Sequence, residues 1–324
     1  MYYKLLKLKN RVYDAAKIDW DHMMFDRSAI WKLLIPLMIE NLLASFMGMA
    51  DSMMVTRIGS AAISAVSLTD AINNLVIQLF SAMATGGTIL CSQYIGSGDP
   101  KKANAAARQV VLSMTSIAIV ITLFAEALNG HILRLVFGSV EPAVLSAAET
   151  YFRFTAASFP FLGLYQIGAA FYRAGGNSRF PMKVSVISNV MNIIGNAIFI
   201  FGFGWGVAGA AFSTLLSRIL AAIILFVFLR KPKQVIVVRD YVIKPDFDMI
   251  ARILAIGIPS GIENSMFQFG KLAIQSSVST LGTTAIAAQA MAIIFENING
   301  IGGLAVGIGL MTMVGQTLGA GRKE

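Results

Sequence analysis

The sequence predicts an all-α membrane protein, a polytopic bundle of transmembrane helices, from its composition, its long apolar stretches and the placement of its basic residues. Hydrophobic residues make up 56% of the 324 and charged residues 13%, and the mean hydropathy is +0.70. A soluble domain carries about 25% charged residues. Too little polar surface remains here to cover a globule in water, so lipid must surround most of the chain.

Eight apolar stretches are long enough to cross a bilayer, because a spanning helix needs about 20 mostly apolar residues. Their approximate ranges are 30–55, 63–92, 105–127, 142–171, 182–203, 206–230, 249–277 and 285–315. Alternation with a period of two is absent, and lipid tolerates no open sheet edge. A helix bundle therefore remains as the expected architecture.

The basic residues gather in short clusters between these stretches. The clusters lie in the N-terminal segment and in the loops after the second, fourth and sixth stretches, namely Lys4, Lys7, Lys9, Arg11, Lys17 and Arg27; Lys101, Lys102 and Arg108; Arg173, Arg179 and Lys183; Arg230, Lys231, Lys233, Arg239 and Lys244. The opposite loops hold only Arg57 and Arg134. Basic loops stay in the cytoplasm, so we expect a multi-pass protein of the inner (cell) membrane with a cytoplasmic N-terminus. This placement explains the net charge of +9 and gives no reason to expect a nucleic-acid partner.

Four segments follow from these patterns. Residues 1–29 form an amphipathic N-terminal segment, and 30–230 an N-lobe of six transmembrane helices. Residues 231–248, the one long polar stretch, contain Pro232 and Pro245 and form a cytoplasmic interlobe linker. Residues 249–324 begin a C-lobe with two transmembrane helices.

An internal repeat crosses that linker. The segment Ile35–Asn41 (IPLMIEN) returns as Ile258–Asn264 (IPSGIEN), and the same offset of 223 residues relates further identical residues without a gap. These pairs are Gly59 and Gly282, Ile63 and Ile286, Asn74 and Asn297, Gln93 and Gln316, Gly96 and Gly319, and Gly98 and Gly321. Six helices separate the copies, so both enter the membrane from one side, as in transporters with parallel repeats. The second copy reaches Glu324 at the equivalent of the loop after the second helix, which predicts eight of an expected twelve helices.

The sequence lacks the residue patterns that several kinds of chemistry require. Cys91 is the single cysteine, and His22 and His131 are far apart in the sequence. Neither histidine has the HExxH spacing of a zinc site, and no Walker GxxxxGK[ST] or GxSxG motif is present. We therefore expect neither an enzyme nor a resident metal or cofactor.

Ionisable residues inside apolar stretches are functional candidates, because each costs about 2.5–3.5 kcal/mol at the centre of a spanning helix on insertion scales. Glu40 and Asp51 are eleven residues apart, close to three helical turns, so both lie on one helix face. Asn189, Asn192 and Asn196 form one polar stripe on a later helix, and Thr214 could add a hydroxyl. The alternatives are that Asp51 simply lies at the outer interface and that the asparagines only pack helices together.

The C-terminal helices carry Glu263, Lys271 and Glu296. Lys271 could instead extend its side chain to the membrane surface, whereas both glutamates are well inside their apolar stretches. Pro36 and Pro259 each remove a backbone hydrogen bond near the start of a span, which makes them candidate hinges. With Glu40 and Asn189, the three charged residues are candidates for lining a substrate cleft.

At these positions the sequence resembles the multidrug and toxic compound extrusion (MATE) family over its whole length. FYRAGGNSRFPM (171–182) is similar to the family pattern RAxGDTRxPM, and NVMNIIGNAIFIFGFGWGVAGAAFST (189–214) to NxxNxxxDxxxIFGxxxGxxGAAxAT. LGTTAIAAQAMA (281–292) and VGQTLGAGR (314–322) are also typical of the family. The resemblance implies a twelve-helix, two-lobed antiporter, monomeric when full length, that exports amphipathic or cationic compounds in exchange for Na⁺ or H⁺.

The resemblance also implies roles for particular residues. Asp51 matches the cation-coupling acid, while Asn192, Asn196 and Thr214 match its partners. Asn196 departs from the family, which commonly has Asp there, so we expect a single-carboxylate site that takes either ion. Glu263 matches a second family acid only approximately. The alternatives are a flippase of lipid-linked precursors, for which a cleft rich in Arg and Lys would speak although only Lys271 is apparent, and a non-transporting fragment.

Overall fold

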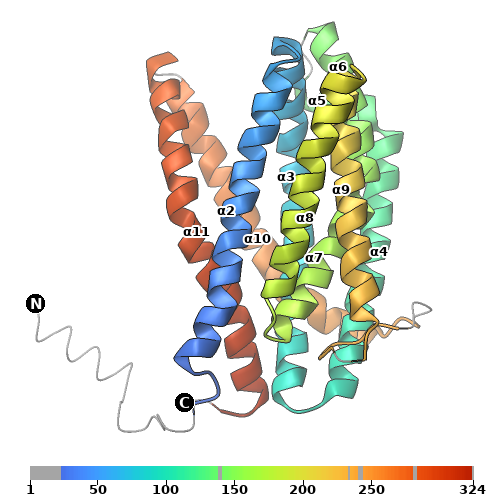
Figure 1. Ribbon diagram of the computed structural model, residues 1–324, viewed down its shortest axis with the longest axis vertical. Helices are drawn as coiled ribbons and strands as arrows, with labels where there is room; N and C mark the ends of the chain where they lie inside the picture. Colours follow the sequence, from blue (N-terminus) through green and yellow to red (C-terminus); the bar gives the residue numbers. More distant parts are fainter. Residues whose placement is uncertain (1–22, 138–140, 233, 240–243, 280–282, 323–324) are drawn as a thin grey trace, which may run out of the picture.

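The computed structural model describes residues 23–137, 141–232, 234–239, 244–279 and 283–322, and all regular structure in them is helical. The helices run roughly along one long axis (Figure 1). In chain order they are α2 (Arg27–Thr56), α3 (Ser60–Gly96), α4 (Pro100–Ala127), α5 (Asn129–Phe137), α6 (Pro142–Ala157), α7 (Phe159–Ala174), α8 (Arg179–Asn196), the π-helix η2 (Ala197–Gly202), α9 (Gly206–Leu229), α10 (Phe247–Ser279) and α11 (Thr283–Gly319). The predicted helix bundle is thus confirmed, while residues 1–22 of the predicted N-terminal segment lie outside the described residues.

Most of the predicted spans are apolar enough to cross a membrane as folded. Six helices of the described residues meet the requirement of length and composition, or seven spans if α6 and α7 count as one. The predicted stretch 249–277 forms the 33-residue helix α10 but is not among them. The reason is its polar middle, where Pro259, Glu263 and Gln268 interrupt the apolar sequence.

The predicted span 142–171 is not one straight helix. α6 and α7 meet at a bend of 45° around Ser158. Pro160 occupies the first turn of α7, where proline is tolerated because the N–H groups there have no partner within the helix. The sequence prediction missed this break because apolar composition continues through it.

α3 is the central helix of the fold. It packs against α4, α6 and α7 of the first bundle and also against α10 and α11. Figure 1 shows α10 and α11 meeting the first bundle at the end that carries the linker and diverging from it toward the other end. We call these the linker end and the far end.

At the linker end the two sequence copies cross in reciprocal pairs. A Cβ on Gly96 would overlap the carbonyl oxygen of Gln316, and a Cβ on Gly319 would overlap that of Gln93. Exchanging each residue for its equivalent in the other copy turns one pair into the other, since Gly96 corresponds to Gly319 and Gln93 to Gln316. Such self-complementary contacts are what a two-fold axis between the copies produces. Since no side chain fits there, the glycines let α3 and α11 touch through their backbones.

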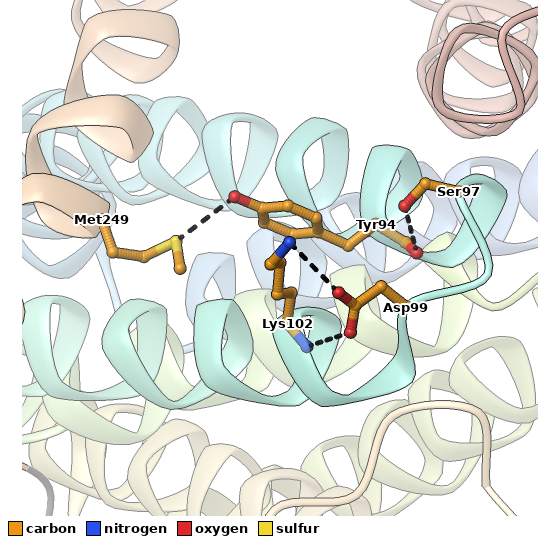
Figure 2. A network of polar contacts seen from close by, with 5 residues as sticks. All are labelled: Tyr94, Ser97, Asp99, Lys102 and Met249. Carbon is orange, nitrogen blue, oxygen red and sulfur yellow. Dashed lines mark hydrogen bonds and ion pairs between the residues drawn. The ribbon is translucent and has the colours of Figure 1, made fainter.

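The turns after the two helices of the crossing also match. Gly98 and Gly321 both have φ of 72°, a left-handed conformation that glycine adopts at low cost. In the first copy, Figure 2 shows that Asp99 then starts α4: its Oδ1 accepts from the backbone N–H of Lys102 at 2.9 Å, and its Oδ2 lies 3.3 Å from Lys102 Nζ. The Lys102 N–H lowers the pKa of the Asp99 carboxyl. The repeat thus extends to backbone conformation.

The interlobe linker is attached to the first bundle. The side chains of Ile236 and Val238 are buried in its main hydrophobic core, and the N–H of Val237 donates to Asn104 Oδ1 at 2.9 Å. Gln109 of α4 donates to Lys244 O at 2.9 Å and accepts from Asp246 N at 3.1 Å. Described parts of the linker therefore pack against α4 rather than crossing freely to α10.

Candidate functional site

The residues matched to cation coupling lie together where α2, α8 and α9 meet. Asn196 Nδ2 donates to Asp51 Oδ1 at 2.6 Å. With its amide nitrogen toward the carboxylate, Asn192 donates to the same oxygen at 2.9 Å, and its own oxygen accepts from Thr214 Oγ1 at 3.2 Å. Four side chains from three helices thus form one polar cluster around a carboxylate.

Local sequence and packing explain this convergence. Asn192 and Asn196 are one helical turn apart at the end of α8, and only 2% and 1% of their surfaces are exposed. Ser213 of α9 donates to Asn192 O at 2.8 Å. A side chain at Gly195 would overlap Ser213, so glycine lets α8 and α9 approach closely. The asparagine stripe therefore points both at α9 and at α2.

Two charged residues that the sequence reading did not select lie near this cluster. Asp70 of α3 and Arg218 of α9 both interact electrostatically with Asp51. Arg218 Nη1 also donates to Ser158 Oγ at the α6–α7 bend, at 2.6 Å. The prediction of a single-carboxylate site did not take these two charged residues into account. Both residues lie within predicted apolar spans, so the rule that selected Asp51 could have found them.

Glu40 lies deeper in the bundle than a cleft-lining residue would. Its side chain accepts from Arg173 Nη2 at 2.8 Å and from Tyr165 OH at 3.1 Å, both on α7, and 8% of the residue is exposed. Glu40 Oε2 has no hydrogen-bond partner in the described part of the chain. Arg173 and Arg218 are also basic residues inside helices. The prediction that only Lys271 occupies such a position is therefore wrong.

The C-terminal candidates are more exposed. Lys271 Nζ lies 2.9 Å from Glu296 Oε1, which links α10 to α11, and 38% and 53% of their side chains are exposed. Glu263 on α10 is exposed. Asn189, also a cleft candidate, is half-buried on α8 and its Nδ2 has no partner among the described residues. Pro36 and Pro259 lie inside α2 and α10, which continue as helices through both.

The coupling cluster offers oxygen ligands. Asp51 supplies carboxylate oxygens, Asn196 an amide oxygen and Thr214 a hydroxyl oxygen, which hard cations prefer. Asn196 Oδ1 has no hydrogen-bond partner within the described residues although the side chain is buried. No group of three or more His, Cys, Asp or Glu that could hold a metal ion occurs in that part of the chain. The arrangement suits transient binding of a monovalent cation or a proton.

Comparison with known proteins places these features in a family. The MatE family model matches residues 36–198 and 259–324. A probable multidrug resistance protein NorM from Thermotoga maritima is 29% identical over 306 residues, which are 92% of this chain and 64% of that protein. The multidrug export protein MepA of Staphylococcus aureus is 27% identical over 268 residues, 81% of this chain and 59% of that protein. The chain therefore spans about three fifths of the length of these relatives.

Solved structures share the fold. Two structures described as MATE in the bent and in the straight conformation both superpose with a TM-score of 0.85 at 22% identity. In each case 91% of this chain is covered, and 66% of the solved chain.

Proposed function

Because the chain belongs to the MatE family, a family of membrane transporters, we propose that the protein is a secondary antiporter. It exports amphipathic or cationic drugs and toxic compounds in exchange for Na⁺ or H⁺. The curated relatives carry names of multidrug resistance and multidrug export proteins, which supports this substrate class. In its full length the protein acts as a monomer in the lipid bilayer.

The observation that carries the proposal is the hydrogen bonding of Asp51. A carboxylate on a membrane-spanning helix receives hydrogen bonds from two buried asparagines, in a bilayer environment where an unpaired charge is costly. A cation bound there neutralises the charge, and its release restores it. The protein therefore has two ionic states that different helix arrangements can favour.

Coupling requires that the ion and the substrate favour different arrangements. α2 is suited to change its arrangement with the bound ion, because it carries Asp51 in its half nearer the far end and packs against α11. Pro36 lies inside α2, and proline weakens a helix at one point. Pro259 lies at the equivalent position inside α10 and would be the second hinge. Alternating access would then open and close the two ends in turn.

The placement in the membrane is part of the proposal. The N-terminus and the linker end face the cytoplasm of a cell (inner) membrane, and the far end faces outward. The two lobes comprise residues 30–230 and 249 onward, joined by the linker 231–248. A cysteine introduced at Gly204 should react with an impermeant thiol reagent added outside, and one at Ser97 should not.

Efflux driven by an imposed ion gradient tests the function. The full-length protein in liposomes should expel a fluorescent organic cation when an inwardly directed Na⁺ or H⁺ gradient is imposed. Asp51→Asn keeps the side-chain shape but removes the charge, so ion-driven efflux should fall to the level of empty liposomes. Glu126→Gln, at an exposed pair with Arg153 (3.9 Å) between α4 and α6, is the control and should leave efflux unchanged. Undiminished efflux by Asp51→Asn would remove this residue from the mechanism.

A further inference from the structure

A second aspartate–asparagine pair lies on α3, and its carboxylate interacts electrostatically with Asp51. Asn73 Nδ2 lies 3.4 Å from Asp70 Oδ1 on α3, as Asn196 Nδ2 lies 2.6 Å from Asp51 Oδ1. Both asparagines are buried, with 4% and 1% of their surfaces exposed. In both, the amide Oδ1 has no hydrogen-bond partner among the described residues. Two carboxylates are thus each accompanied by a buried amide oxygen that lacks a donor.

Buried amide oxygens without donors are unusual, because the large majority of buried polar side-chain atoms have a partner. An amide oxygen that binds a cation needs no hydrogen-bond donor, so cation binding is one way to satisfy such an atom. Asp51 and Asp70 also interact electrostatically with each other. Two interacting carboxylates repel each other unless positive charge lies nearby.

Arg218 supplies that charge. Its guanidinium interacts electrostatically with Asp51, Asp70 and the buried Tyr151, and its Nη1 donates to Ser158 Oγ at 2.6 Å. Ser158 is fully buried, so this bond fixes the guanidinium at the α6–α7 bend. With two negative charges and one positive charge, the group has a net charge of −1.

We propose that Asp70, held by Asn73, is the second carboxylate of the coupling site, and that Arg218 is a built-in counter-charge that limits this site to one monovalent cation. The inference rests on the proposed function, because it extends the ion site at Asp51. Asn196 cannot supply a negative charge, and Asp70 supplies it from α3. Arg218 then neutralises one of the two acids, so one Na⁺ or one proton completes the charge balance. A divalent cation would leave an unbalanced positive charge in the bilayer.

The tests measure ion binding, which is independent of transport. Tryptophan fluorescence of the purified full-length protein is titrated with Na⁺ at constant pH, with protons in the absence of Na⁺, and with Ca²⁺. Asp70→Asn removes a negative charge and should weaken binding of the coupling ion about tenfold, or ~1.4 kcal/mol. Arg218→Gln leaves two unbalanced carboxylates, so it should bind the coupling ion about tenfold more tightly and also bind Ca²⁺. Asp70→Asn/Arg218→Gln restores the net charge of −1 and should bring the affinity to within about threefold of the unmodified protein, without Ca²⁺ binding.

Two further variants separate charge from folding. Arg218→Lys keeps the positive charge and should not bind Ca²⁺, and Glu126→Gln controls for loss of a carboxylate elsewhere. If Arg218→Gln does not fold, the Asp70→Asn result together with Arg218→Lys decides the matter. Unchanged ion affinity in Asp70→Asn overturns the inference, as does the absence of Ca²⁺ binding in a folded Arg218→Gln variant. If the unmodified protein binds neither Na⁺ nor protons at Asp51, the proposed function itself fails, which is a separate result.

Discussion

The two copies of the internal repeat place equivalent glutamates in different surroundings. Glu40 and Glu263 occupy equivalent positions after Pro36 and Pro259, yet Glu40 is buried against Arg173 while Glu263 is exposed. The partners of Glu40 are Arg173 and Tyr165, both on α7. Equivalent sequence therefore gives equivalent helices, but the packing neighbours decide what a charged side chain does.

The ion pairs of the two regions differ in the same way. Arg173 and Glu40 have 14% and 10% of their side chains exposed, whereas Lys271 and Glu296 have 38% and 53%. Removing one partner of a buried pair leaves an uncompensated charge, while an exposed pair contributes little. The burial of the pair, rather than its distance, sets its importance, since the two distances are 2.8 Å and 2.9 Å.

The largest expected effect tests directly whether burial determines how much an ion pair contributes to stability. Glu40→Gln leaves the buried charge of Arg173 without its ionic partner. It should therefore lower the free energy of unfolding by about 3–5 kcal/mol. Glu296→Gln, the matched change in the more exposed pair, should lower it by a smaller amount. Thermal unfolding of the purified protein in detergent measures both. Equal losses for the two variants would mean that burial does not distinguish the pairs.

The second prediction is that the two repeat copies are in contact at the linker end and separated farther from it. Ser92 and Gly315 are repeat-related and touch at the linker end, so cysteines at both, in a Cys91→Ser background, should form a disulfide under mild oxidation in most molecules. Leu79 and Gly302 are related by the same offset but lie farther from the linker end. Leu79 is exposed and Gly302 has open space where its Cβ would be, so cysteines there should stay reduced. Mobility on a denaturing gel without reductant reads both pairs, and cross-linking of the second pair alone would place the contact at the wrong end.

The smallest expected effect concerns the turn after α3. The pKa of Asp99 is lowered by the N–H of Lys102, so its ionised form stabilises the fold above the ordinary pKa of Asp, about 4, and this contribution disappears as the pH falls below that value. Asp99→Asn keeps a good helix cap but removes the charge. Its thermal unfolding temperature should be slightly below that of the unmodified protein at neutral pH, and the difference should vanish near pH 3. A difference that persists in acid would point to the cap geometry instead of the charge.

Much of the fold follows from the sequence alone. Bilayer thickness sets the length of a spanning helix, so runs of apolar residues predicted the helices without any knowledge of their neighbours. The offset of 223 residues likewise predicted related halves, and the reciprocal contacts of Gly96 and Gly319 agree with it. The resemblance supplied the cluster of Asp51, Asn192, Asn196 and Thr214, whose side chains do meet in space.

Tertiary structure alone decided which charges meet. Asp70, Arg218 and Arg173 are on three different helices, and each interacts with a residue outside its own helix, namely Asp51, Ser158 and Glu40. Helical periodicity tells which face a residue occupies but not which helix lies opposite that face. The same limit explains the bend at Ser158, where a continuous apolar sequence concealed two helices. Lengths and faces are local properties of the chain, whereas the pairing of charges across helices depends on how the whole bundle packs.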